Sequence, residues 1–510
     1  MSSTDGNRIE RSELKRKSVR GGIVTMVSQA VCIAIQLTSV VVLARLLSAE
    51  DYGVVAMVMT VISFAGLFRD LGLSSAVIQK KDLTDRLQSN LFWLNVALGG
   101  ALTLIVAAAS PLVAWFYKNP DLTTVSLTLS SSFLIVSLGT QHGARLVRDM
   151  HFIRQAVASV AGSLISLLVS ISFALQGYSY WALVWGMLLG SLTTTVLLFL
   201  LSPFWPSCPA KDGEVRKMLT FGANVTAFDF INYFHRNLDS VLIGKYCSPE
   251  ILGYYSRAYQ LMMFPINAIR GPINAVAFPA LSRLQDEPNA YRAYYRRITF
   301  LVAFTSMPIC AFLFVTSDPL ISLLLGPQWL PASPIFSMLA ITGFIQPTAS
   351  LRGLVMLSRK RGKAYLLWGA LNALSVTLGF LIGIWWGAVG VALGYAVANY
   401  TILYPSLLIA FHSTPVMKTD FFLPILRPAT AAIAGSMVAL LSLEVLTNVS
   451  LIPRLTIVAT VFFICYLAVF ISLPGGWREL RLNAILWRHL MPQREVSGQA
   501  GYVSSIAQSR

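Results

Sequence analysis

The stretch of sequence that decides the fold runs from residue 22 to residue 53 and reads GIVTMVSQAVCIAIQLTSVVVLARLLSAEDYG. Its first part, residues 22–47, contains a single charged side chain, Arg45. About 20 apolar residues cross a bilayer as a helix, whereas the apolar core of a cleaved signal peptide spans roughly 7–15 residues. The stretch therefore predicts a transmembrane helix, preceded by a basic cytoplasmic tail over residues 1–21.

Apolar segments of spanning length recur along most of the chain. Of its 510 residues, 55% are hydrophobic and only 12% are charged, whereas soluble proteins carry about 25% charged residues. So few charges cannot cover a soluble surface, and we expect an all-α integral membrane protein with about fourteen transmembrane helices. The expected spans are 22–47, 52–68, 89–116, 122–144, 155–175, 180–202, 219–245, 252–280, 298–316, 333–357, 364–384, 386–411, 424–446 and 453–473.

Basic residues outnumber acidic ones, with 39 Lys and Arg against 22 Asp and Glu. In a soluble protein this excess would indicate nucleic-acid binding. In a membrane protein, basic residues hold loops on the cytoplasmic side. With the N-terminus inside, 31 of the 39 fall in cytoplasmic segments, four in outer segments and four within spans. We therefore expect an even number of spans, both termini in the cytoplasm and no nucleic-acid partner.

An internal repeat with an offset of 200 residues relates residues 22–53 to residues 222–253. The identical pairs are Gly22/Gly222, Val41/Val241, Ser48/Ser248, Glu50/Glu250 and Gly53/Gly253. The first and seventh spans enter from the same side, as a parallel repeat of two six-span halves requires. We therefore expect two pseudo-symmetric six-helix lobes followed by two C-terminal helices.

The expected organisation has six parts and no separate extramembrane domain. Near residues 477–491 the chain has one apolar face and is predicted to form an interfacial helix. The parts are a cytoplasmic tail (1–21), an N-terminal lobe (22–202), a cytoplasmic linker (203–218), a C-terminal lobe (219–411), helices 13 and 14 (412–473) and a cytoplasmic tail with the interfacial helix (474–510).

Polar and ionisable side chains concentrate in the seventh and eighth expected spans. Such residues are costly in lipid and usually face a cavity or a partner. A spacing of three or four residues places most of them on one helical face. They are Asp229, Asn232, His235, Arg236 and Asp239 on the seventh span, Arg257, Gln260, Asn267, Arg270 and Asn274 on the eighth, and Arg352 on the tenth. We interpret them as the lining of a water-filled cavity between the lobes.

Two interpretations of these charges stay open. The arginines outnumber the acids, so a guanidinium is available for an anionic group, which it binds at any relevant pH. The alternative is a structural ion pair, in which Asp229 or Asp239 binds Arg236 or an arginine of the eighth span.

The first span carries neutral residues where the seventh carries charges. The repeat pairs Gln29 with Asp229, Gln36 with Arg236 and Ser39 with Asp239. Neutral amides suit sugar hydroxyls, and equally suit ordinary hydrogen bonds between helices. At the start of the eighth span, we expect Tyr254 and Tyr255 to belong to the aromatic belt at the membrane interface.

Sequence signals of common enzyme sites are absent. The chain has no GxxxxGKS or GxxxxGKT nucleotide loop, and no histidine is followed by Glu as in the HExxH zinc motif. Its five cysteines are scattered and form no CxxC pair, which argues against a disulfide framework or a zinc site. We expect no catalytic residue, no cofactor and no bound metal ion.

Seven short motifs resemble those of bacterial polysaccharide exporters, the Wzx-like oligosaccharide flippases. The resemblance is to the colanic acid and succinoglycan exporter branch of the multidrug/oligosaccharidyl-lipid/polysaccharide superfamily, and it covers nearly the whole chain. The motifs are LSAEDYG (47–53), LFRDLGL (67–73), AVIQKKD (76–82), YFHRNLD (233–239), LGYYSRAY (252–259), FPALSR (278–283) and LGPQW (325–329).

The resemblance implies an inner-membrane flippase for undecaprenyl-pyrophosphate-linked oligosaccharide units, acting by alternating access in exopolysaccharide or lipopolysaccharide synthesis. The last two spans would hold the lipid tail. Cavity arginines would bind the pyrophosphate, and other polar residues would line the cavity or couple transport to an ion. The implied substrate residues are Arg236, Arg257, Arg270 and Arg352, and the other cavity residues are Gln29, Gln36, Asp229, Asn232, His235, Asp239, Asn267 and Asn274.

The implied partners are the lipid-linked oligosaccharide, membrane lipid, and the polysaccharide polymerase with its chain-length machinery. The related lipid II flippases carry cavity arginines on their first span, where this chain has Gln29 and Gln36, so lipid II is not the expected substrate. Two other functions stay open. An ion-coupled exporter of cationic drugs predicts an acidic cavity, and an O-antigen polymerase or ligase needs sizeable outer loops.

Overall fold

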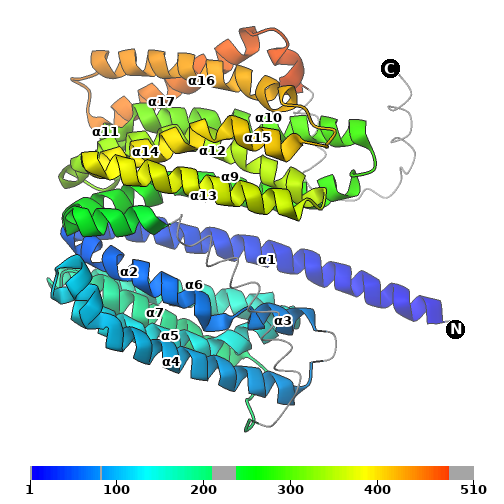
Figure 1. Cartoon of the computed structure of the whole chain (residues 1–510), viewed down its shortest axis with the longest axis vertical. Coiled ribbons are helices and arrows are strands. Elements are labelled where there is room, and N and C mark those ends of the chain that lie inside the picture. Colours follow the sequence, from blue (N-terminus) through cyan, green and yellow to red (C-terminus); the bar gives the residue numbers. More distant parts are fainter. Residues whose placement is uncertain (1–2, 81–82, 210–236, 482–510) are drawn as a thin grey trace.

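The computed structural model describes residues 3–80, 83–209 and 237–481, and every regular element in these ranges is a helix (Figure 1). The helices before residue 209 pack on one another, and α1 runs between them and the rest of the molecule. They are α1 (Ser3–Leu46), α2 (Ala49–Asp70), α3 (Leu73–Gln79), α4 (Asp85–Tyr117), α5 (Asp121–Arg148), α6 (Phe152–Leu175) and α7 (Trp181–Leu201). We call this group the first half.

The second half begins with a helical segment at residues 237–246. Its last two long helices, α16 and α17, pack against α10, at the top of Figure 1. The elements are α9 (Pro249–Arg283), α10 (Pro288–Val315), α11 (Ser317–Leu324), η1 (Pro327–Ala332), α12 (Ser333–Ser358), α13 (Gly362–Gly383), η2 (Ile384–Trp386), α14 (Gly387–Thr401), α15 (Leu403–Phe411), α16 (Thr419–Val445) and α17 (Leu451–Ser472). The boundaries of the six expected parts stay predictions.

The predicted all-α membrane fold is confirmed. Eleven helical stretches among the described residues are long and apolar enough to cross a membrane. The count of fourteen spans stays a prediction, because most of the seventh expected span falls in residues 210–236, outside the described ranges. The expected spans 364–384 and 386–411 lie in one apolar stretch, Gly362–Phe411. Within this stretch, α14 ends at Thr401 and α15 begins at Leu403. Pro405, in the first turn of α15, has no backbone N–H with which to continue the hydrogen bonds of α14.

The starts of α2 and α9 show the internal repeat in three dimensions. Ser48 precedes α2 and Ser248 precedes α9, and each hydroxyl accepts a hydrogen bond from the third amide of its helix. Both distances, to the amides of Asp51 and Ile251, are 3.2 Å. Such a cap satisfies an amide that the first turn of a helix leaves without a partner. Residues 200 positions apart therefore play the same structural role.

Buried apolar side chains show where the two halves meet. One cluster joins them, with Leu43 and Val58 from the first half and Leu252 and Trp329 from the second. Among the described residues, each half also has a cluster of its own, one around α3, α4 and α5 at the far end of the first half and one that runs along α10, α12, α16 and α17 of the second half. We call the shared end, which surrounds the turns at residues 47–48 and 247–248, the junction.

Candidate functional site

At the junction, two glycines let helices of opposite halves touch. Gly53 of α2 faces the carbonyl oxygen of Pro249, and Gly253 of α9 faces that of Ala49. A methyl group at either glycine would overlap the facing oxygen. Because the repeat relates Gly53 to Gly253, the contact is reciprocal, and each half presents the same backbone surface to the other, as in a two-fold symmetric interface.

Two cations cross the junction in the same reciprocal manner. Arg45, at the end of α1, donates from Nη2 to the carbonyl oxygen of Leu323 at 2.9 Å. Its repeat counterpart, Lys245, donates to the carbonyl oxygen of Phe116 and lies 4.3 Å from the centroid of that ring. The two carbonyls belong to the last turns of α11 and α4, where helix carbonyls lack partners and the helix dipole attracts cations. Each half thus binds a helix end of the other.

Trp329 adds a third contact between the halves. Its indole Nε1 donates to the carbonyl oxygen of Ala44 at 2.7 Å. Its ring makes edge contacts with Tyr52 and Tyr254, at centroid distances of 5.4 and 5.7 Å. The side chain is fully buried. The η1 segment of the second half is therefore anchored to α1 and α2 of the first.

Arg257, a predicted substrate residue, also lies at the junction. Its guanidinium carbon is 4.3 Å from the centroid of the Tyr52 ring, a cation–π contact between α9 and α2. Its Nε is buried and has no hydrogen-bond partner in the described part of the chain. A buried donor without a partner is costly.

Asp239 is held within its own half. Its carboxylate accepts hydrogen bonds from the Tyr255 hydroxyl and the Ser240 amide, both at 2.7 Å, and its side chain is buried. The expectation that Tyr255 belongs to the interfacial belt is wrong, because this buried carboxylate draws its hydroxyl inward and leaves the residue 1% exposed. Tyr254 is half-buried and donates to Glu250 at 2.8 Å.

Farther from the junction, several polar side chains of α1 and α9 are exposed or half-buried. Gln29, Gln36 and Asn267 are exposed, and Arg270 and Asn274 are half-buried. Polar groups facing hydrocarbon would lose their hydrogen bonds to water. Although α9 has 35 residues, it is not among the eleven apolar stretches of the described chain. These features favour a water-filled space beside α1 and α9.

Arg352 lies apart from these residues, inside the second half. It is 4% exposed, and its guanidinium carbon is 5.1 Å from the centroid of the Trp368 ring. The structure therefore groups it with α12 and α13, not with Arg257 at the junction. The remaining predicted residues, Asp229, Asn232, His235 and Arg236, lie outside the described ranges.

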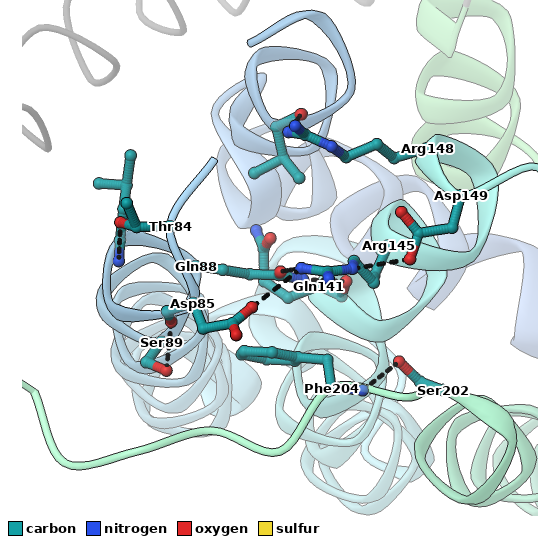
Figure 2. Close-up of polar contacts among 12 residues, drawn as sticks. Thr84, Asp85, Gln88, Ser89, Gln141, Arg145, Arg148, Asp149, Ser202 and Phe204 are labelled. Atoms are coloured by element: carbon teal, nitrogen blue, oxygen red, sulfur yellow. Dashed lines mark hydrogen bonds and ion pairs between the residues drawn. The ribbon is translucent and has the colours of Figure 1, made fainter. Parts of the chain in front are cut away.

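Sequence reasoning missed a polar network inside the first half. Gln88 and Asn95 of α4 and Gln141 of α5 are fully buried. The Gln141 amide donates to Asn95 Oδ1 at 2.7 Å, and the Gln88 amide donates to the carbonyl oxygen of Gln141 at 3.3 Å. Arg145 then joins Gln88 to Asp149, with both bonds at 2.8 Å (Figure 2). The seven-residue spacing of the two α4 amides was the available signal, because it places both on one face.

Comparison with known proteins identifies related sequences. Residues 42–334 match the model of a family described as polysaccharide biosynthesis protein. The lipopolysaccharide biosynthesis protein WzxC of Escherichia coli (strain K12) is 25% identical over 391 residues, which cover 72% of this chain and 79% of that protein. The teichuronic acid biosynthesis protein TuaB of Bacillus subtilis (strain 168) is 29% identical over 309 residues, which cover 60% of this chain and 64% of that protein.

A solved structure of the lipid II flippase MurJ, in an inward closed conformation, shares the fold. The superposition has a TM-score of 0.71 and covers 92% of this chain and 99% of that chain. The sequences are 15% identical, so this similarity concerns the fold alone.

Proposed function

The chain belongs to the polysaccharide biosynthesis protein family, and from this premise we propose that it is a flippase for lipid-linked oligosaccharides. It carries undecaprenyl-pyrophosphate-linked repeat units across the bacterial inner membrane, with both of its termini in the cytoplasm. Relatives named for the biosynthesis of lipopolysaccharide and teichuronic acid support this substrate class. The chain changes the position of its substrate and not its bonds, so we propose no catalytic residue.

The observation that carries the proposal is the unequal contact between the two halves. They share one apolar cluster at the junction, whereas the other clusters of described residues each belong to one half, one around α3, α4 and α5 at the far end and one along α10, α12, α16 and α17. Alternating access requires two halves that close at one end while they are apart at the other. The scarcity of basic residues in the segments around Arg45 and Lys245 assigns the junction to the outer face. The described state is then closed to the outside and receives substrate from the inner leaflet.

Arginines provide the proposed recognition of the pyrophosphate. Arg257 and Arg270 lie on α9, and Arg236 is proposed to join them from the seventh span. Guanidinium groups stay charged and form strong charge-assisted hydrogen bonds with phosphate oxygens. An exporter of cationic drugs would need free carboxylates. Asp239, the predicted cavity acid within the described ranges, is already bonded to Tyr255.

Two further partners follow from the proposed reaction sequence. A repeat unit delivered to the outer leaflet must be joined to others, so a polysaccharide polymerase consumes the product. Chain-length machinery acts on the same polymer. We propose that both work next to this protein at the outer face of the inner membrane.

Neutralising the arginines tests the proposal. In a strain lacking the gene, we compare the wild type with Arg270→Gln, Arg236→Gln and the control Lys363→Gln, an exposed residue at the start of α13. We measure exported polymer and accumulated lipid-linked oligosaccharide at matched protein levels. Each arginine variant should lose about ten- to a hundredfold in export, because a hydrogen bond to a charged group contributes about 1.5–3 kcal/mol.

The same experiment has two contradicting outcomes. Undiminished export in both arginine variants would contradict the proposed anion site. A deletion strain that accumulates no lipid-linked oligosaccharide would contradict the proposed flippase function itself.

A further inference from the structure

A cavity of about 420 Å³ lies between α1, α6 and α7 of the first half. None of its lining side chains is acidic, basic or aromatic. Its polar lining consists of Gln36 and Ser39 of α1, Ser163 and Ser166 of α6, and Ser191 and Thr194 of α7. By contrast, a second cavity of about 570 Å³ between α1 and α6 is lined almost entirely by apolar side chains. The hydroxyls and amide are therefore concentrated on one side of these helices.

The position of the cavity follows from the faces of α7. Gly186 and Gly190 approach serines of α6 closely, and Thr195 donates to the carbonyl oxygen of Ile135 of α5 at 3.0 Å. Ser191 falls between these two faces, since successive residues of a helix turn by about 100°. The cavity therefore lies on the inner side of α7, within the helix bundle of the first half.

Four polar side chains of the cavity make no hydrogen bond within the described part of the chain. Thr194 and Ser163 donate to carbonyl oxygens one turn back, Gly190 at 3.0 Å and Ser159 at 2.9 Å. Hydroxyls in membrane helices commonly form such bonds. The side chains that make no hydrogen bond to any described residue are Gln36, Ser39, Ser166 and Ser191. They present donors and acceptors from three helices to whatever occupies the cavity.

We propose that this cavity binds a sugar of the transported oligosaccharide, a role that rests on the proposed function. Sugar hydroxyls donate and accept hydrogen bonds, as do serine hydroxyls and the glutamine amide. Neutral partners bind them without the free-energy cost of burying an ion. Ile35, Leu167 and Met187 supply apolar surface for the C–H groups of the ring. Small-molecule sites span about 300–1,000 Å³, and this cavity falls in that range.

Repeat-related positions show how the two halves differ. Gln36 and Ser39 occupy the positions of Arg236 and Asp239. Where the second half carries charge, the first half carries neutral hydrogen-bonding groups. Divalent cations prefer carboxylate oxygens, which this lining lacks. The first half thus recognises the sugar, and the arginines of the second half recognise the pyrophosphate.

The test compares binding of two lipids to the purified full chain in detergent by native mass spectrometry. One is the lipid-linked oligosaccharide extracted from cells of the source strain that lack the gene, and the other is undecaprenyl pyrophosphate without sugar. The cavity variant is Ser166→Ala with Ser191→Ala. The control is Ser172→Ala with Thr193→Val, residues of the same two helices that do not line the cavity.

The wild type and the control should prefer the sugar-bearing lipid. The cavity variant should lose about tenfold of that preference, because two hydrogen bonds are removed, and should bind the bare lipid as before. A cavity variant that keeps the full preference overturns the sugar site and leaves the proposed function intact. A wild type that binds neither lipid overturns the proposed function and the sugar site together. Alanine for serine removes one oxygen and adds no bulk, and a cavity variant that binds the bare lipid is thereby shown to be folded.

Discussion

Gly53 and Gly253 determine how closely the two halves approach at the junction. Each faces a backbone carbonyl oxygen of the other half, with no room for a Cβ atom. Contacts of this kind place Cα hydrogens against carbonyl oxygens, which contribute weakly but recur where helices pack closely. The identity of the pair was readable in the sequence repeat. The contact that requires glycine at these two positions joins residues about 200 positions apart, and it could not be predicted from a single sequence.

Substituting either glycine by valine should prevent full closure of the junction. Gly53→Val and Gly253→Val force added atoms into the facing carbonyl, and overpacking of this kind costs about 1–3 kcal/mol. Polymer export should fall about tenfold. The control is Gly100→Ala, because a Cβ atom at Gly100 meets nothing within 4 Å. Export by both valine variants at the control's level would show that junction contact is dispensable.

Arg45 and Lys245 should hold the junction closed against water. Neutralising both, as Arg45→Gln with Lys245→Gln, removes two cationic bonds to helix ends. A cysteine at the buried position Leu47 should then react faster with an impermeant maleimide. The measurement uses a chain whose five native cysteines are replaced by serine, with Lys118→Gln as the control at an exposed residue. Equal labelling rates in all variants would contradict this role.

At the scale of elements, α9 is where sequence reasoning was most informative. The expected span 252–280 lies within α9, and its polar residues set it apart from the eleven apolar stretches of the described chain. Periodicity identified these residues because they share one helix. The cavity between α1, α6 and α7 could not be found in this way, since its serines are spread over three helices and each resembles an ordinary packing residue.

The amide network of α4 and α5 should behave as one unit. Asn95→Leu alone leaves the buried Gln141 amide without its 2.7 Å partner, and such a group costs about 1–3 kcal/mol. Replacing both residues by leucine should destabilise less than the sum of the single changes. The four proteins are the wild type, Asn95→Leu, Gln141→Leu and the double variant. Their thermal unfolding in detergent measures this coupling. Additive changes would show that the two amides act independently.

At the scale of the whole molecule, composition and the apolar segments predicted the membrane fold, and the repeat predicted two pseudo-symmetric lobes. The partners of individual charged side chains were harder to predict from the sequence. Arg352 stacks on Trp368 inside the second half, and Asp239 binds Tyr255. Both partners are set by tertiary packing, which hydropathy and spacing do not encode. What the structure adds is that, among the described residues, the halves share one apolar cluster at the junction, and each half also has a cluster of its own.

The central claim is that the chain moves lipid-linked oligosaccharide by opening and closing the junction. The most direct test is a flipping assay in proteoliposomes, using Arg45→Cys with Leu323→Cys in the cysteine-free chain and a short, reducible thiol cross-linker. Impermeant periodate reports sugar that reaches the outer leaflet. We predict protein-dependent oxidation of the sugar that stops on cross-linking and returns on reduction. Oxidation no faster than in protein-free liposomes, or unchanged by the cross-link, would contradict the account.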